Sequence, residues 1–256
     1  MSTSGRRYVA IGNSIRNDLL SSNYKVGDRL PTERVIAEQY GVSRTVIREA
    51  VIMLELEGLV EVRKGSGVYL VTDPASVAEP QTASELKLTS NHSTQPDIGP
   101  FEMLQGRQLI ESNLAEFAAL NVTKTEILAM RNILAREKEL VESGLPSDDL
   151  DKQFHLHIAQ ASKNSLLIEI CETMWQRREQ SPMWKQLHTR IDNTNYRLKW
   201  LDDHSAILTA LQRKDGVEAK RAMWQHLENV KQVLLNYSDV DDDQFDGFLF
   251  DSYPLS

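Results

Sequence analysis

Three histidines and one aspartate have the types and spacing of a metal site. Asp151 and His155 are four residues apart, so on a helix their side chains lie on one side, beside an apolar face. His204 and His226 each fall within an apolar series at helical spacing later in the chain. The pattern predicts four polar groups pointing inward from three helices, where burial without partners is costly. A divalent cation would satisfy them together, although a single inward histidine is more often a satisfied core residue.

The ligand types limit the candidate metals but do not identify one. Neutral imidazole and carboxylate are accepted by Zn²⁺, Ni²⁺ and Mn²⁺ alike. His157 and His188 fall outside the pattern, and Cys171, the only cysteine, excludes a Cys-based zinc site and an intrachain disulfide. Cys171 is interpreted as a small buried hydrophobe. We therefore expect a divalent metal ion, Zn, Ni or Mn, at Asp151, His155, His204 and His226.

The helices that must hold these residues follow residue 100. Helical periodicity continues to about residue 237 without strand-like alternation, and Thr123 and Glu126 have the spacing of a capping box. Further helices are expected from Asp148 and after Asn164, then one helix over 183–214 and a last one over 217–237. The first helix is predicted to turn five apolar residues inward: Leu104, Ile110, Leu114, Phe117 and Ala118. The economical architecture is an antiparallel α-helical bundle.

A second candidate site lies near the N-terminus, in residues 31–67. Thr32 and Ser43 have the positions of N-caps for two short helices, and Gly41 between them supplies the turn. Two helices joined in this way form a helix-turn-helix, whose second helix enters the major groove by its N-terminal end. Arg44, Thr45 and Arg48 lie there, off the apolar face, and are expected to point outward. Alternating residues around 63–67 predict a hairpin wing.

The remaining segments divide the chain. We expect a DNA-binding domain over 1–73, beginning with an amphipathic helix over 8–22, and a Pro- and Ser-rich linker over 74–99. An all-helical domain follows over 100–237, and an acidic and aromatic tail over 238–256. The fold class is mainly α: an N-terminal winged helix-turn-helix plus a C-terminal antiparallel bundle.

Charge and hydropathy limit the classes of function that the chain can have. The net charge of -8 argues against nucleic acid, but residues 1–73 hold ten Lys and Arg against nine Asp and Glu, whereas the remainder holds 19 against 28. This asymmetry fits a protein that contacts DNA with one end only. No run reaches the ~18 apolar residues of a membrane helix, and the N-terminus lacks an apolar signal region, so we expect a cytoplasmic protein without membrane contact.

The segment LPTERVIAEQYGVSRTVIREAVIMLELEGLVEVRKGSGVYL resembles the winged helix-turn-helix of the GntR family of bacterial transcription regulators. The resemblance covers about the first seventy residues. It implies that DNA contacts are made by six residues: Arg34, Arg44, Thr45, Arg48, Lys64 and Gly65.

The second half resembles the FCD ligand domain of the FadR subfamily. The resemblance rests on Arg107 with Glu111, Asp151 with His155, Asp203-His204, and Met223 with His226. It implies that the aspartate and three histidines bind a metal that also coordinates a carboxylate effector.

A narrower resemblance, to the hexuronate-utilisation repressors of enterobacteria, spans nearly the whole chain and includes GPFEMLQGRQLIESNLAEFAAL and FDGFLFDSYPL. It implies a sugar acid such as fructuronate, glucuronate or galacturonate as the effector. Arg107 and Arg178 are the candidates for its carboxylate or hydroxyls, with Asn164 beside them. Alternatively, Arg107 only pairs with Glu111 across one helical turn, and Asn164 is only an N-cap.

The resulting hypothesis is a ligand-responsive transcription repressor, acting as a homodimer on a pseudo-palindromic double-stranded operator. It is not an enzyme. A metalloenzyme acting on a sugar acid is the rival, but no further Glu or Asp at inward spacing stands out as a general base. An architectural DNA-binding protein without a small ligand is a second alternative, and it leaves the inward histidines unexplained.

Overall fold

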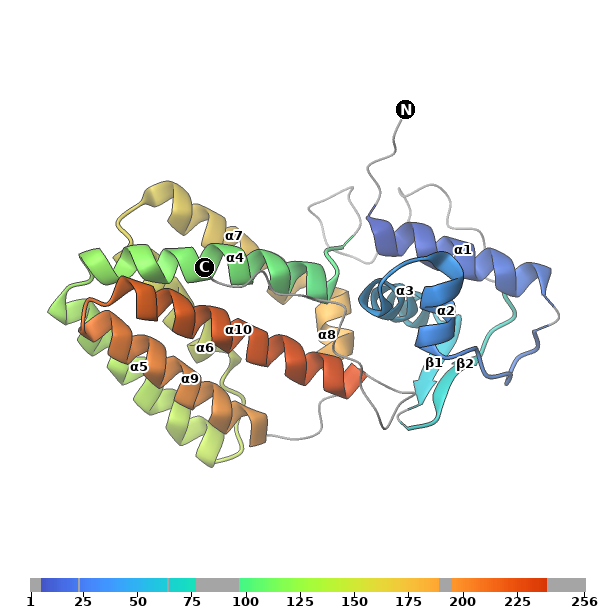
Figure 1. Ribbon diagram of the computed structural model, residues 1–256. Helices are drawn as coiled ribbons and strands as arrows, with labels where there is room; N and C mark the ends of the chain where they lie inside the picture. The colour runs from blue at the N-terminus through green and yellow to red at the C-terminus, as the bar shows by residue number, and fades with distance from the viewer. Residues whose placement is uncertain (1–5, 23, 64, 77–96, 189–194, 239–256) are drawn as a thin grey trace.

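The chain forms a small N-terminal head and a larger helical bundle (Figure 1). A computed structural model describes residues 6–22, 24–63, 65–76, 97–188 and 195–238. The head contains α1 (Arg7–Ser21), α2 (Glu33–Tyr40), α3 (Arg44–Leu56), β1 (Val60–Arg63) and β2 (Gly67–Leu70). The bundle contains α4 (Pro100–Asn121), α5 (Lys124–Glu142), α6 (Asp148–Ala161), α7 (Ser165–Gln180), α8 (Pro182–His188), α9 (Asn195–Gln212) and α10 (Gly216–Ser238). The predicted mainly α class is confirmed.

Local signals in the sequence position the two helices of the helix-turn-helix. The Thr32 side chain accepts the Val35 amide, and the Ser43 side chain accepts the Val46 amide, so each helix begins at its predicted cap. Gly41 has φ 62°, the left-handed conformation that ends α2 and turns the chain toward α3. Ile47, Ala50, Val51 and Leu54 of α3 are buried at helical spacing and form its apolar face.

The wing is an antiparallel hairpin in which Val60 pairs with Leu70 and Val62 with Val68. The segment before α2 extends this sheet, because the Leu30 amide donates to Val68 O at 2.8 Å and the Leu70 amide donates to Asp28 O at 2.9 Å. Ile15 and Leu19 are buried on one side of α1, and this helix packs on α3. The hairpin and α1 therefore fix α3 from two sides.

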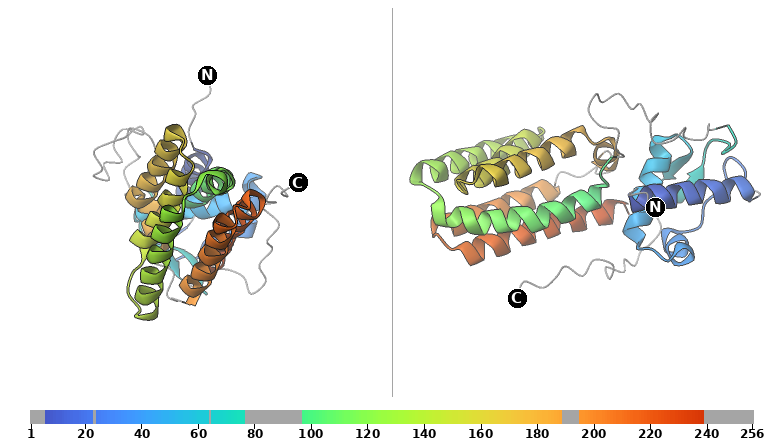
Figure 2. Two further views of the ribbon diagram at one scale, coloured as in Figure 1. Left: turned by 90° about the vertical axis from the view of Figure 1, so that its left-hand side faces the viewer. Right: turned by 90° about the horizontal axis from the view of Figure 1, so that it is seen from above.

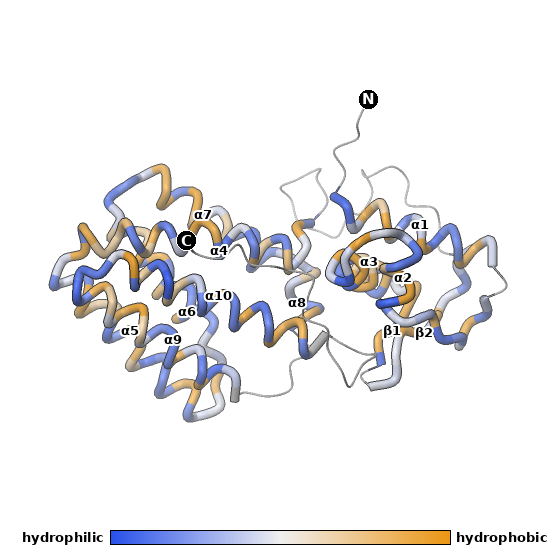
Figure 3. The backbone as a smooth tube through the Cα atoms, viewed as in Figure 1, coloured by the Kyte–Doolittle hydropathy of each residue, from blue (hydrophilic) through white to orange (hydrophobic). Residues whose placement is uncertain are grey.

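The bundle is built from antiparallel neighbours. Helix α10 packs along α4 and α9, while α5 packs on α6 and α9, and α7 covers α4 and α6 (Figures 1 and 2). Hydrophilic and hydrophobic stretches alternate along these helices (Figure 3), so that each buries one side. The capping box of Thr123 and Glu126 is present at the start of α5. Within the described residues, none of the helices is both long and apolar enough to cross a bilayer.

Two expectations for the bundle were wrong. Phe117 is 43% exposed on α4, although the neighbouring Leu114 and Ala118 are buried. A helix with apolar residues on most of its circumference does not reveal from sequence which of them its neighbours will cover. The predicted helix over 183–214 is divided into α8 and α9, and residues 189–194 between them lie outside the described residues. So do residues 77–96 of the proposed linker and 239–256 of the tail.

The head packs directly against the bundle. Helix α3 contacts α8 and the beginning of α4, and buried apolar residues of both parts form one continuous cluster. Gln186 of α8 donates to Glu55 of α3 at 3.0 Å, and Tyr8 of α1 donates to the Asp97 carbonyl at 2.8 Å. The orientation of α3 is therefore tied to the helices of the bundle.

Candidate metal centre and nucleic-acid interface

The four predicted metal ligands meet inside the bundle. Asp151 and His155 come from α6, His204 from α9 and His226 from α10, and the three imidazoles are at most 2% exposed. One ligand atom from each of the four residues can be chosen so that all lie within 4.8 Å of one another. The prediction that these side chains converge is confirmed.

The same imidazole nitrogen, Nε2, faces the centre of the cluster in each histidine. His204 Nε2 lies 3.2 Å from His226 Nε2, and Asp151 Oδ1 lies 3.5 Å from Nε2 of both His155 and His204. The buried Nε2 of His155 has no hydrogen-bond partner among the described residues. A cation at the centre would give this atom a partner, because Nε2 lone pairs and carboxylate oxygens are the donors that a divalent metal accepts. The donor set therefore fits the implied metal.

A second layer of carboxylates holds the other ring nitrogens. The Nδ1 atoms of His155, His204 and His226 lie 2.6 Å from Glu111, 3.2 Å from Glu137 and 3.4 Å from Asp203, respectively. A carboxylate that accepts the Nδ1 proton leaves the Nε2 lone pair free for a metal and fixes the orientation of the ring. The Nδ1 atoms of His204 and His226 have such a hydrogen-bond partner, whereas Glu111 is in ion-pair contact with His155.

Sequence reasoning missed the role of these carboxylates. Glu111 was paired only with Arg107, and this pair is present, with Arg107 Nε donating to Glu111 at 2.7 Å. Glu137 was overlooked, although it follows Met130 and Leu134 at inward spacing on α5 and is 4% exposed. Glu137 is therefore an inward acidic residue beyond the predicted ligands, and it contacts an imidazole of the cluster. The position of Glu137 within that apolar series was the sequence feature that could have predicted its burial.

The buried charges shift several pKa values. Burial would raise the pKa of Glu111, but Arg107 and His155 outweigh it and lower this pKa to about 2. Burial, reinforced by the neighbouring His204, lowers the pKa of His226 to about 3. His226 is therefore neutral at pH 7, which is the form that binds metals. Burial would lower the pKa of His155, but Glu111 and Asp151 raise it.

Arg178 lies beside the cluster in a setting suited to an anion. Its guanidinium carbon lies 4.7 Å from the ring of Trp175 and 4.5 Å from that of Trp184, and the side chain is 6% exposed. Its Nη2 is 3.8 Å from Asp151, and its buried Nε has no hydrogen-bond partner among the described residues. Arg107 covers the Trp175 ring at 4.1 Å. Two cations and a tryptophan thus border the metal ligands.

Asn164 is not beside Arg178, and the expectation that it lies there was wrong. It is exposed at the N-terminus of α7, where its side chain accepts the Leu167 amide at 3.2 Å. Arg178 is near the opposite end of this helix, about 20 Å away at the helical rise of ~1.5 Å per residue. Asn164 acts as an N-cap, the alternative that its position in the sequence left open.

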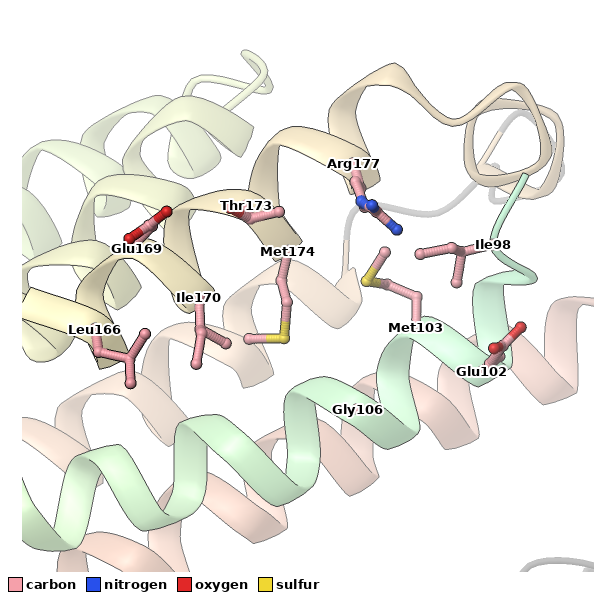
Figure 4. Close-up of a pocket in the computed structure, with 10 residues that line it drawn as sticks. All are labelled: Ile98, Glu102, Met103, Gly106, Leu166, Glu169, Ile170, Thr173, Met174 and Arg177. Atoms are coloured by element: carbon pink, nitrogen blue, oxygen red, sulfur yellow. The ribbon is translucent and has the colours of Figure 1, made fainter. Parts of the chain in front are cut away.

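A shallow groove of about 370 Å³ lies between α4 and α7, apart from the metal ligands (Figure 4). Met103 and Gly106 of α4 line one side, and Ile170, Met174 and Arg177 of α7 the other. Its lining contains none of the three residues predicted to contact the effector. The metal ligands and Arg178 are thus in the closed interior of the bundle, not in this open groove.

The residues predicted to contact DNA have unequal exposure. Arg34 is exposed on α2 and pairs with Glu38 at 3.0 Å. The expectation that Arg44, Thr45 and Arg48 point freely outward was wrong, because they are 7, 4 and 2% exposed. Arg48 Nε donates to Glu33 at 2.7 Å, because the first turn of α2 places that carboxylate across the helix pair. Gly65 is at the exposed turn of the wing, and Lys64 lies outside the described residues.

A winged helix-turn-helix joined to an all-helical domain with an internal polar site defines a DNA-binding regulator with a sensory domain. Residues 7–70 match the bacterial regulatory proteins of the gntR family, and residues 102–229 match the FCD domain. The chain belongs to the GntR family and carries an FCD domain. It is a DNA-binding transcription regulator, and the metalloenzyme alternative is set aside.

Curated relatives resemble the chain over nearly its whole length. It is 50% identical to the Uxu operon regulator of Haemophilus influenzae, over 98% of this chain and 90% of that protein. It is 51% identical to the Uxu operon transcriptional regulator of Escherichia coli, over 98% and 95% of the two chains. It is 45% identical to the Exu regulon transcriptional regulator of Escherichia coli, over 98% and 93%.

Proposed function

We propose that this chain is a repressor of hexuronate-utilisation genes, released or retained on its operator according to a sugar acid bound in the bundle. The observation that carries the proposal is the convergence of three Nε2 atoms and Asp151 on one point, with Arg178 beside them. Similarity to regulators named for the Uxu operon and the Exu regulon supports the effector class.

Asp151, His155, His204 and His226 would hold a divalent cation. When bound, the metal supplies positive charge and open coordination positions for a carboxylate and a hydroxyl. The charges of the chain favour such an ion. Among the described residues, Asp151 and the three outer carboxylates are faced by two guanidiniums, those of Arg107 and Arg178, and by His155, whose pKa is raised. Without a cation, this excess negative charge would repel a sugar-acid anion. The ligands leave Zn, Ni and Mn as candidates.

Arg178 would bind the carboxylate or a hydroxyl of the effector. A guanidinium offers paired donors that match a carboxylate, and Arg178 is paired with Asp151 only at 3.8 Å. Arg107 is held by Glu111 at 2.7 Å, so it would shape the site through Glu111 and Trp175 while keeping its own ion pair.

The head would read the operator as part of a homodimer. The proposed contact set is the exposed Arg34, the wing with Lys64 and Gly65, and the N-terminal end of α3, where Arg44, Thr45 and Arg48 would have to turn outward from their buried positions to reach DNA. One such head covers only a few base pairs, each good Arg–guanine contact contributing roughly 1–3 kcal/mol. Two heads related by a two-fold axis double this set, which requires a pseudo-palindromic operator.

A thermal-shift screen tests the proposal. D-fructuronate, D-glucuronate and D-galacturonate would each be added with Zn²⁺, Ni²⁺, Mn²⁺ or EDTA, with D-glucose as the control that lacks a carboxylate. We expect at least one uronate to raise Tm with metal but not with EDTA, and to change operator binding in a gel-shift assay. His226→Ala should remove both effects. Equal stabilisation in EDTA would remove the metal from the proposal, and no response to any sugar acid would reject it.

A further inference from the structure

The first turn of α4 is capped by a side chain from another helix. Glu49 of α3 accepts the amides of Phe101 and Glu102 through Oε1, at 3.1 and 3.2 Å. These are the second and third residues of α4, whose amides an N-cap side chain normally satisfies. The residue at the N-cap position, Gly99, has no side chain, and Pro100 after it has no amide to satisfy.

The sequence at this junction leaves room for the Glu49 carboxylate. A Cβ on residue 99 would lie within 3 Å of this carboxylate, so a larger residue there would displace the Glu49 side chain from its present position. Glu49 is 6% exposed, and its negative charge lies at the positive end of the α4 dipole. This cap therefore joins the helix that carries the proposed DNA contacts to the first helix of the bundle.

The same helix reaches the metal centre. Glu111 lies nine residues after Glu102 on α4, about 13 Å along the axis, and its carboxylate is 2.6 Å from His155 Nδ1. Arg107, between them, pairs with Glu111 and covers Trp175. A shift of α4 at the metal centre would move its N-terminus as part of one continuous 22-residue helix.

We propose that Glu49 is the positioning residue that couples the effector site to α3, by capping α4 in place of the side chain that Gly99 lacks. The effector would bind the protein more tightly when α4 is in one of two positions. Its binding would then shift α4 to that position and change the orientation of α3 through this cap. The inference rests on the proposed function, because it needs a ligand at the metal centre. It assigns Glu49 no contact with the effector.

A pair of substitutions separates coupling from stability. Glu49→Ala removes the cap and leaves the α4 amides unsatisfied. Adding Gly99→Ser supplies a cap from within α4, and the space vacated by the carboxylate accommodates the new side chain. The double variant should regain most of the Tm lost in Glu49→Ala, but not the link between α4 and α3. Glu57→Gln is the control within the head, because Glu57 follows α3 and its ion pair is with Arg16 of α1; its Tm would be measured too, since the change removes one partner of a largely buried pair.

The readout is operator affinity, measured with DNA selected from a random library. For each protein it would be measured with EDTA, with Mn²⁺ or Zn²⁺ alone, and with metal plus the D-uronate that stabilises the wild type. Uronate binding would be measured separately by calorimetry. We expect a change in operator Kd of roughly 5- to 150-fold for the wild type and Glu57→Gln. We expect less than about twofold for Glu49→Ala/Gly99→Ser, with uronate affinity unchanged.

A double variant that keeps the wild-type change in operator Kd overturns the inference and leaves the proposed function standing. A wild-type protein that binds metal and operator, but whose operator affinity responds to neither metal nor uronate, overturns both. Loss of uronate binding in the double variant would also contradict the inference, since it would show that the effector site itself needs Glu49.

Discussion

At the scale of single residues, each histidine of the candidate metal centre has a carboxylate beside its Nδ1 atom, and the three carboxylates come from three different helices. Glu111 comes from α4 and contacts His155, and Glu137 comes from α5 and contacts His204. Asp203 comes from α9 and contacts His226. Because these carboxylates fix the ring orientations, the four ligands need little rearrangement to take up a cation. Substituting one of these carboxylates should therefore change the affinity for a metal.

Glu137→Gln should lower the affinity for a divalent metal by roughly 10- to 100-fold, because an amide holds the His204 Nδ1 proton less strongly than a carboxylate. Isothermal calorimetry with Zn²⁺ or Mn²⁺ would measure the loss. Glu142→Gln, an exposed change at the end of the same helix, is the control and should leave the affinity unchanged. Equal affinities in the two variants would show that Glu137 does not support the site.

Arg178→Gln should weaken uronate binding to the metal-loaded protein at least 10-fold while metal affinity is kept, because the variant loses a charged donor beside the ligands. Its neighbour Arg177 points into the open groove between α4 and α7 (Figure 4). Arg177→Gln is therefore the matched control. If Arg177→Gln lost uronate binding and Arg178→Gln did not, the effector would have to bind in the groove instead.

At the scale of elements, the helix-turn-helix carries an ion pair in its interior. Arg48 and Glu33 have side-chain exposures of 2% and 3%, whereas the Arg34–Glu38 pair on α2 is about two-thirds exposed. Removing one partner of a buried pair leaves an uncompensated charge, and an exposed pair contributes little. Arg48 therefore has a structural role in the head as well as a proposed role at DNA.

Arg48→Ala should lower the free energy of unfolding by about 3–5 kcal/mol, and Arg34→Ala by less than about 1 kcal/mol. Urea denaturation would measure both. Operator affinity should fall in both variants, so Arg34→Ala reports DNA contact without a stability effect. An Arg34→Ala variant that binds the operator as tightly as the wild type would remove Arg34 from the contact set.

The junction of α3 and α4 should make stability depend on pH. Burial raises the pKa of Glu49 from 4.5 to about 7, despite the α4 amides that favour its charged form. The folded protein therefore binds this proton more tightly than the unfolded chain. The resulting stability is full below pH 4.5 and is lost as the pH rises through 7, a decrease of about 3 kcal/mol at most. Urea denaturation at several pH values between 4.5 and 8 should show a weaker dependence for Glu49→Gln than for the wild type. Parallel curves would contradict the raised pKa.

At the scale of the whole molecule, one head and one bundle make a unit that offers a single recognition helix. A second copy would double the number of base contacts, which is why we propose a homodimer. The acidic bundle would repel phosphate, so DNA should approach from the side of the head. The contacts of α3 with α4 and α8 tie the orientation of each head to its own bundle.

A selected operator should be pseudo-palindromic, and a DNA fragment with one half-site should bind far more weakly than the full site. Increasing the salt concentration from 50 to 200 mM should lower affinity by roughly 10³-fold or more, because several phosphate contacts release counterions. Fluorescence anisotropy at a series of salt concentrations would measure this, with light scattering to follow the dimer. A half-site fragment that binds as tightly as the full operator would contradict recognition by a dimer.

The sequence by itself determined the helices, their caps at Thr32, Ser43 and Thr123, and the inward direction of the three histidines. These features depend on contacts within a few residues, between a cap and the next amides or between side chains one helical turn apart. Only the tertiary structure decided that Glu137 reaches His204, that Arg48 is buried against Glu33, and that Glu49 caps α4. Each of these depends on how helices distant in the chain pack against one another, and no local spacing carries that information.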